Sequence, residues 1–353
     1  MAATALLLCA CRYDDSVAAV YEEPGRIATH ICSLGPSTYC ALLFRRYDES
    51  SSVIAKGYSP DMEIETVYTL PEGSLTYELT AGGFIIAFYE LTTYSDGSVN
   101  YALKVIDEDN KVHSPYSKTV SEDNEIQTRF LAVYDDCVYY LTKSNLLGRC
   151  RVMKYSVKDK ELTEYLGFEF TENELTNGSS CTFISEKNGY LTCGVVDGGK
   201  TTLKTYDLRT GGLVREKPLP FGAALVYMAD HDYEAGTYAI YYLSAQGDER
   251  IASFAYTDND MTDITTLGTD TYVSREEVRI HGDTVYYELQ DTSKEKPYDQ
   301  FTGVILNTAT GEKEEYPGCM TIYIKADTTY GLFFDKNRGY EKMILKKLSE
   351  KGA

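Results

Sequence analysis

The segment Ile240-Tyr241-Tyr242-Leu243 decides the fold of this chain, because related segments return along most of the sequence. Each is a short run of aliphatic and aromatic residues, which is the composition of a buried β-strand. Turn residues such as Asp135-Asp136 or Asn188-Gly189 precede several of them, as expected for a hairpin that leads into such a strand. The related segments are Ile85-Ile86-Ala87-Phe88-Tyr89, Val138-Tyr139-Tyr140-Leu141, Val285-Tyr286-Tyr287 and Leu332-Phe333-Phe334, with weaker versions at Cys40-Ala41-Leu42-Leu43-Phe44 and Tyr190-Leu191-Thr192-Cys193.

A second pattern, a strand followed by a polar turn and another strand, comes after these segments. The clearest case is Leu203-Lys204-Thr205-Tyr206-Asp207, which leads into Thr210-Gly211-Gly212. Similar cases begin at Leu103, Met153 and Val304. These hairpins resemble those of β-propeller repeats of the YVTN and PQQ kinds, in which a Tyr-Asp-x-x-Thr-Gly turn joins the third and fourth strands of a blade. The resemblance extends to WD40-like blades and to bacterial propeller lipoproteins, and it implies an all-β chain of four-stranded blades.

The repeat length predicts the number of blades. Counting from the strand before each aromatic segment, units begin near residues 26, 75, 128, 180, 223, 276 and 319, at intervals of 43 to 53 residues. Four-stranded blades repeat every ~40–50 residues. We therefore expect a β-propeller of about seven blades, with six or eight blades, or a pair of smaller β domains, as alternatives.

The seventh unit lacks a fourth strand, because the chain ends at Ala353 shortly after Met343-Ile344-Leu345-Lys346-Lys347-Leu348. The segment Ser16-Val17-Ala18-Ala19-Val20-Tyr21 near the other end can supply it. An N-terminal strand in the last blade closes the ring and removes an open sheet edge. We therefore predict that residues 12–353 form a single propeller domain.

The first residues resemble the end of a lipoprotein signal segment. Leu8-Cys9-Ala10-Cys11 has the order of a bacterial lipobox, and an apolar run precedes it. The departure is that no Lys or Arg precedes that run, so an apolar β-strand is the alternative. On the lipobox interpretation, residues 1–11 are the remnant of the signal segment and Cys11 carries the lipid. The protein is then extracytoplasmic and touches the membrane only through that anchor.

The charge of the chain limits the classes of partner that we expect it to bind. Against 34 basic residues stand 54 acidic ones, for a net charge of −20. Such a surface repels nucleic acid, which we exclude as a partner. The chain has 32 tyrosines and no tryptophan, which disfavours sugar stacking, although tyrosine can serve less strongly in that role.

Nine cysteines occur without any Cys-x-x-Cys spacing, so a structural zinc site is not expected. The pairs Cys32/Cys40 and Cys181/Cys193 each flank an expected tight turn and are candidates for cross-strand disulfides. Buried free thiols are the more common outcome for such residues.

No motif commits the chain to a reaction. The sequence Asp230-His231-Asp232 contains metal-binding residue types, but a polar turn between strands is the favoured interpretation. The acidic groups Asp107-Glu108-Asp109-Asn110 and Asp258-Asn259-Asp260 with Asp263 resemble parts of calcium sites, and neither has the complete spacing of an EF-hand. Solvated turns explain them better. We predict no metal or other cofactor and assign no catalytic residues.

Two hypotheses for the function remain. The first is a non-catalytic propeller, monomeric and outside the cell, that presents its loops to a protein, peptide or glycan. The second is a secreted hydrolase or lyase that acts on polysaccharide or peptide with carboxylates gathered at one mouth of the central channel. The scarcity of histidine, four in all, and the lack of catalytic motifs favour the first.

Overall fold

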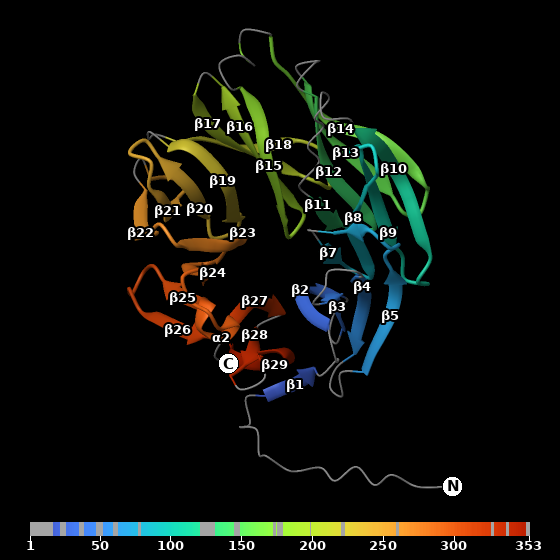
Figure 1. Ribbon diagram of the computed structural model, residues 1–353. Helices are drawn as coiled ribbons and strands as arrows, with labels where there is room; N and C mark the ends of the chain where they lie inside the picture. The colour runs from blue at the N-terminus through green and yellow to red at the C-terminus, as the bar shows by residue number, and fades with distance from the viewer. Residues whose placement is uncertain are drawn as a thin grey trace, which may run out of the picture.

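The computed structural model describes residues 17–350 except short stretches within them, and the described residues form seven antiparallel sheets arranged in a ring (Figure 1). The stretches outside the description are 22–25, 35–38, 47–51, 59–62, 77–78, 121–130, 145–148, 172–173, 175–178, 198, 220–222, 259–260, 326–327 and 337–338. Each sheet is one blade, so the prediction of an all-β propeller with about seven blades is confirmed.

The blades follow one another in chain order, and we number them 1 to 7. Blade 1 consists of β2 (Arg26–Leu34), β3 (Tyr39–Arg46), β4 (Ser52–Tyr58) and β5 (Glu63–Thr69). Blade 2 consists of β6 (Ser74–Leu75) and β7 (Leu79–Gly82), which both pair with β8 (Ile85–Thr93), followed by β9 (Val99–Ile106) and β10 (Val112–Val120). Blade 3 consists of β11 (Leu131–Tyr134), β12 (Cys137–Ser144), β13 (Arg149–Ser156) and β14 (Glu161–Glu169).

Blades 4 to 7 repeat this order. Blade 4 consists of β15 (Ser180–Lys187), β16 (Tyr190–Asp197), β17 (Lys200–Asp207) and β18 (Leu213–Pro218), and blade 5 of β19 (Ala223–Asp232), β20 (Thr237–Ser244), β21 (Glu249–Ala255) and β22 (Thr262–Thr266). Blade 6 consists of β23 (Thr271–His281), β24 (Thr284–Asp291), β25 (Phe301–Asn307) and β26 (Lys313–Pro317), with the short helix α2 (Pro297–Gln300) before β25. Blade 7 consists of β27 (Cys319–Lys325), β28 (Thr328–Asp335), β29 (Gly339–Glu350) and β1 (Val17–Tyr21).

The last blade closes as predicted. Strand β1 pairs with β29, and Val20 and Tyr21 lie opposite Ile344 and Met343. The N-terminal strand therefore supplies the fourth strand that the seventh unit lacks. The predicted starts of the repeats fall at or within five residues of the innermost strands, except the start near residue 128, which lies outside the described residues.

The turns between strands follow from local sequence. Asn188 and Gly189 join β15 to β16 with φ angles of 54° and 84°. Two consecutive positive φ values define a tight hairpin turn whose twist matches that of the strands, and Asn-Gly is its preferred sequence. The aromatic segments that follow such turns become second strands, with Tyr139, Tyr140 and Tyr287 almost fully buried.

The hydrophobic core is divided among the blades. Each cluster of buried side chains lies between two consecutive sheets, such as the cluster of Phe183 and Leu203 from blade 4 with Val226 and Ile240 from blade 5. Equivalent clusters join the other described neighbours. The middle strands of each blade are covered on both faces by the neighbouring blades. Their sequences are therefore continuous apolar runs rather than alternating ones.

Candidate functional site

The segment Asp230-His231-Asp232 lies in strand β19 and is buried, so the prediction of a polar turn is wrong. The turn begins one residue later, at Tyr233. Because successive side chains of a strand point to opposite faces, the two aspartates face blade 6 and His231 faces blade 4. The three groups therefore do not converge on one ion. Within the described part of the chain, no three His, Cys, Asp or Glu side chains gather in a way that could hold a metal.

The two aspartates join the innermost strands of neighbouring blades. Asp230 accepts a hydrogen bond of 2.9 Å from the backbone amide of Ile280 and lies 3.4 Å from the ammonium of Lys187. Asp232 accepts one of 2.8 Å from the amide of Gly282 and lies 3.4 Å from Nδ1 of His281. Buried carboxylates with such partners are anchored, and we assign them to ring assembly.

His231 is 1% exposed and belongs to the contact between blades 4 and 5. Its Nδ1 lies 3.1 Å from the hydroxyl of Thr192, which lies 2.8 Å from that of Thr205. Burial lowers the pKa of His231 to about 4, so the imidazole is neutral at pH 7.

The acidic group at residues 107–110 forms a turn. Asp107 accepts hydrogen bonds from the amides of Asp109 and Lys111, and Nε2 of His113 lies 2.7 Å from its other oxygen. Tyr155 of blade 3 continues this chain with its hydroxyl 3.2 Å from Nδ1 of His113. The group is a turn, as predicted, but Asp107 is partly buried rather than solvated, and its carboxylate is occupied by the protein itself.

The carboxylates of the second acidic group are likewise bonded to other groups of the protein. Asp263 pairs with Arg250 at 2.8 Å and accepts a hydrogen bond from the hydroxyl of Tyr242. Asp258 accepts a hydrogen bond from the amide of Ala255. Asn259 and Asp260 lie outside the described residues.

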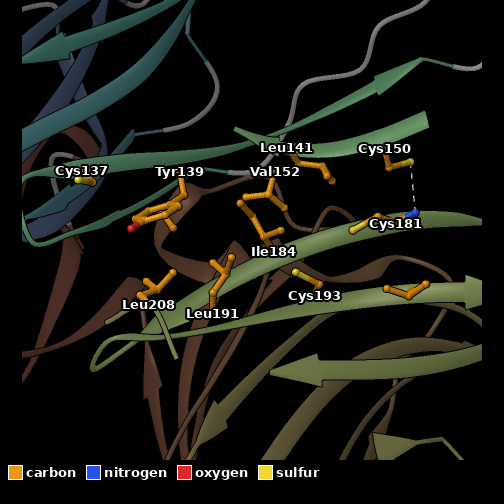
Figure 2. Close-up of a cluster of buried hydrophobic side chains, with 12 residues drawn as sticks. Cys137, Tyr139, Leu141, Cys150, Val152, Cys181, Ile184, Leu191, Cys193 and Leu208 are labelled. Atoms are coloured by element: carbon orange, nitrogen blue, oxygen red, sulfur yellow. Dashed lines mark hydrogen bonds between the residues drawn. The ribbon is translucent and has the colours of Figure 1, made fainter. Parts of the chain in front are cut away.

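The cysteines of blades 3 and 4 are free thiols in a hydrophobic cluster (Figure 2). Cys150 accepts a hydrogen bond from the backbone amide of Cys181, and Cys193 lies on the adjoining strand. Burial raises the pKa of the Cys150 thiol. Because Cys181 and Cys193 are both free thiols, the candidate disulfide between them is absent. Cys32 and Cys40 do not lie opposite each other, because Cys32 pairs with Ala41 and Cys40 with Ser33.

A stack of cationic and aromatic side chains crosses from blade 4 to blade 5. Tyr190 and Tyr233 stack with their ring centres 3.9 Å apart and their planes at 17°. The guanidinium of Arg215 lies 4.2 Å from the ring centre of Tyr233 and 4.6 Å from that of Tyr256. We call the whole series the arginine–tyrosine surface; in order, its members are Arg209, Tyr190, Tyr233, Arg215, Tyr256 and Lys217.

The arrangement of the blades places these residues together. Tyr190 follows the β15–β16 turn and Tyr233 stands in the equivalent β19–β20 turn of the next blade. Arg215 and Lys217 are two residues apart on the outer strand β18, so they share one face of it. Since strand direction alternates, most of these positions lie at or near the same end of their blades; Lys217 lies further along β18, opposite Leu203.

The charges of this surface are held in place but are only partly neutralised. Arg209 lies 3.6 Å from Asp207, whereas none of the described carboxylates forms an ion pair with Arg215 or Lys217. The ammonium of Lys217 donates to the backbone carbonyls of Tyr256 and Asp258, which fixes its position and leaves its charge in place. In a chain of net charge −20, three cations, Arg209, Arg215 and Lys217, are thus gathered on one surface.

This surface cannot be read from the sequence, because its six members are scattered between residues 190 and 256. The one available signal is the recurrence of a tyrosine at or directly after the first turn of consecutive blades, in Asn188-Gly189-Tyr190 and Asp232-Tyr233. Cys11, the predicted lipidation site, lies outside the described residues. Among the described helices, none could cross a lipid bilayer.

The seven antiparallel sheets place the chain among β-propeller proteins. No protein-family model and no curated protein sequence matches it. Similar solved structures include the β-propeller domain of the Trilobed protease from Pyrococcus furiosus, with a TM-score of 0.57, 12% identity, and coverage of 94% of this chain and 97% of that one. A chain of the Mitotic Checkpoint Complex matches with a TM-score of 0.55, 10% identity and coverage of 99% and 100%.

A Pyrococcus horikoshii acylaminoacyl peptidase matches with a TM-score of 0.55 and 11% identity over 92% of this chain, which spans only 52% of the peptidase. These likenesses establish the fold. They include propellers of peptidases and of a protein complex, so they leave the choice between binding and catalysis to the site itself.

Proposed function

We propose that this protein is a non-catalytic binding propeller that holds a protein, peptide or glycan outside the cell, with the arginine–tyrosine surface as its binding site. The observation that carries the proposal is the stack itself. Tyrosine and arginine are the residue types most enriched where partners bind tightly. Here they are fixed by mutual stacking before any ligand arrives, which lowers the entropy cost of binding.

The polar groups elsewhere in the described blades support the same assignment. The buried carboxylates Asp230, Asp232 and Glu288 each accept a backbone amide of the next blade and serve the assembly of the ring. The stack, by contrast, includes Tyr256, which is 36% exposed, and Arg209, whose side chain is 55% exposed. It is therefore accessible to a ligand.

Arrays of peptides and glycans probed with the labelled protein test the proposal. We expect ligands that the wild type binds and that Tyr233→Ala loses. Tyr272→Ala, which removes a tyrosine that is 46% exposed on blade 6, is the matched control. A ligand that both variants bind as the wild type does would place the site elsewhere. Cleavage of a bound ligand, followed by mass spectrometry, would favour the alternative of a hydrolase or lyase.

The proposed location rests on Leu8-Cys9-Ala10-Cys11. If Cys11 is the anchor, only Arg12 to Ser16 separate the lipid from the closing strand β1, so the propeller stands close to the membrane surface. Mass spectrometry of the protein made from its complete reading frame tests this. A diacylglyceryl adduct on Cys11 is expected, and an unmodified Cys11 would contradict an anchored location.

A further inference from the structure

We infer that the partner of the arginine–tyrosine surface is an acidic polypeptide segment, bound through its carboxylates. This inference rests on the proposed binding function and specifies the chemistry of the ligand. Three properties of the surface support it: which ring faces are open, which groups point to solvent, and which charged side chains flank it.

The rings at the centre of the stack have no free face. Tyr190 lies against one face of Tyr233 at 3.9 Å, and Arg215 lies 4.2 Å from the same ring centre. Two groups at such distances cannot share one face, so they cover both. Tyr190 is covered in the same way, by Tyr233 and by Arg209 at 5.4 Å. A sugar ring binds to the open face of an aromatic ring, and the central rings do not offer one.

The stack instead presents hydrogen-bond donors. Guanidinium and ammonium groups have only donors, and a phenol hydroxyl can donate as well. Stacking of Arg215 between two rings uses the faces of its guanidinium and leaves the N–H groups at its edge for a partner in the same plane. Its Nη1 is buried, and the guanidinium interacts there with the side chain of Tyr238, so binding must use the other edge. A carboxylate matches such an edge in geometry and charge.

The neighbouring acids are mostly engaged already. Asp207 lies beside Arg209, Glu216 pairs with Lys204 at 3.7 Å, and Asp258 accepts the amide of Ala255. Glu234, next to Tyr233 in the turn, is exposed and forms no ion pair with a described residue. Like the carboxylates of Asp207, Glu216 and Asp258 it opposes an acidic ligand, and because it has no described partner it supplies a variant that should improve binding.

The exposed aliphatic residues at the start of β18 do not extend this surface. The register shift in β18 pairs Leu213 with Tyr206 and Arg215 with Thr205, so Leu213 and Arg215 face opposite sides of the strand. The preference for a polypeptide over an acidic polysaccharide therefore rests on the covered faces of the central rings, on which a uronic acid ring cannot stack.

The test is fluorescence anisotropy with a labelled peptide of about ten residues that alternates Glu with Val, beside its Gln counterpart and a labelled oligogalacturonate. We expect the Glu peptide to bind most tightly. Arg215→Gln should weaken it about tenfold or more, the usual effect of losing a charge-assisted contact. Arg151→Gln is the charge-matched control, since Arg151 pairs with Glu164 on blade 3, and it should change binding less than about twofold.

Glu234→Gln keeps the inference falsifiable if Arg215→Gln fails to fold, because an exposed turn residue is replaced by one of equal size. It should strengthen binding of the Glu peptide by about two- to fivefold. Unchanged or weaker binding would overturn the inference, as would equal effects of Arg215→Gln and Arg151→Gln. Tighter binding of the Gln peptide or of oligogalacturonate through the same residues would also overturn it, yet would leave the binding function intact.

Discussion

The pH dependence of stability should reflect two groups that titrate in opposite directions, the partly buried Glu186 and the buried His231. Glu186, at the end of β15, accepts a hydrogen bond of 2.8 Å from the amide of Gly189, and burial raises its pKa from 4.5 to about 7. His231 on the neighbouring blade is buried and its pKa falls from 6.5 to about 4. Asp230 and Lys187 lie near both groups.

The signs follow from which state holds the proton. For His231 the folded pKa is depressed, so stability is present above pH 6.5 and is lost as the pH falls towards 4, because only the unfolded chain gains the proton. For Glu186 the folded pKa is raised, so stability is present below pH 4.5 and is lost as the pH rises through 7. Between about pH 7 and pH 5 each group shifts the free energy of unfolding by about 2 kcal/mol, in opposite directions.

The two contributions therefore nearly cancel in the wild type, and substitution of either group should reveal the other. Glu186→Gln keeps an acceptor for Gly189 and should lose about 2 kcal/mol more than the wild type on acidification from about pH 7 to pH 5. His231→Asn keeps a partner for Thr192 and should shift by a similar amount in the other direction. The assay is urea unfolding at a series of pH values, with exposed Glu161→Gln as the control. Parallel curves for wild type and Glu186→Gln would refute the raised pKa of Glu186.

Three further predictions concern the fold. Deletion of residues 12–21 removes β1 from β29 and should lower the melting temperature by about 5 °C or more, so an unchanged value would argue against closure. Gly194→Ala should destabilise by about 1–3 kcal/mol, because its new Cβ would lie 2.2 Å from the Phe183 ring, while Gly212→Ala, with nothing nearer than 3.6 Å, should have little effect. Thiol labelling followed by mass spectrometry should find the five described cysteines protected when folded and labelled in urea; any of these five left unlabelled after unfolding would indicate a disulfide.

The sequence predicted what depends on local pattern. A run such as Val138-Tyr139-Tyr140-Leu141 after two aspartates specifies a strand after a tight turn wherever it occurs. Repetition of that unit gave the blade count, and the incomplete seventh unit gave the closing strand. These inferences needed no knowledge of which residues touch across blades.

The errors and omissions all concern contacts between blades. Asp230-His231-Asp232 is as polar as a turn, yet it is buried because Ile280 and Gly282 of the next blade offer backbone donors to the two aspartates. Arg215 could not be linked to Tyr233 or Tyr256, since 18 and 41 residues separate them and only the packing of blade 4 on blade 5 brings them together. A period in the sequence reveals the blades but not which side chains meet between them.

The overall charge and the local charge of this molecule act at different distances, and that difference bears on which ligands it selects. A net charge of −20 repels every polyanion at long range, whereas the cations of the arginine–tyrosine surface act within about one Debye length, ~8 Å at physiological salt. A long nucleic acid must place many phosphates near the acidic remainder of the surface and gains few contacts in return. A short acidic segment can lie on Arg209, Arg215 and Lys217 alone, with its ends in solvent. On the proposed binding function, the acidic surface would restrict the site to ligands that fit the stack, so the charge that at first sight opposes binding would add selectivity.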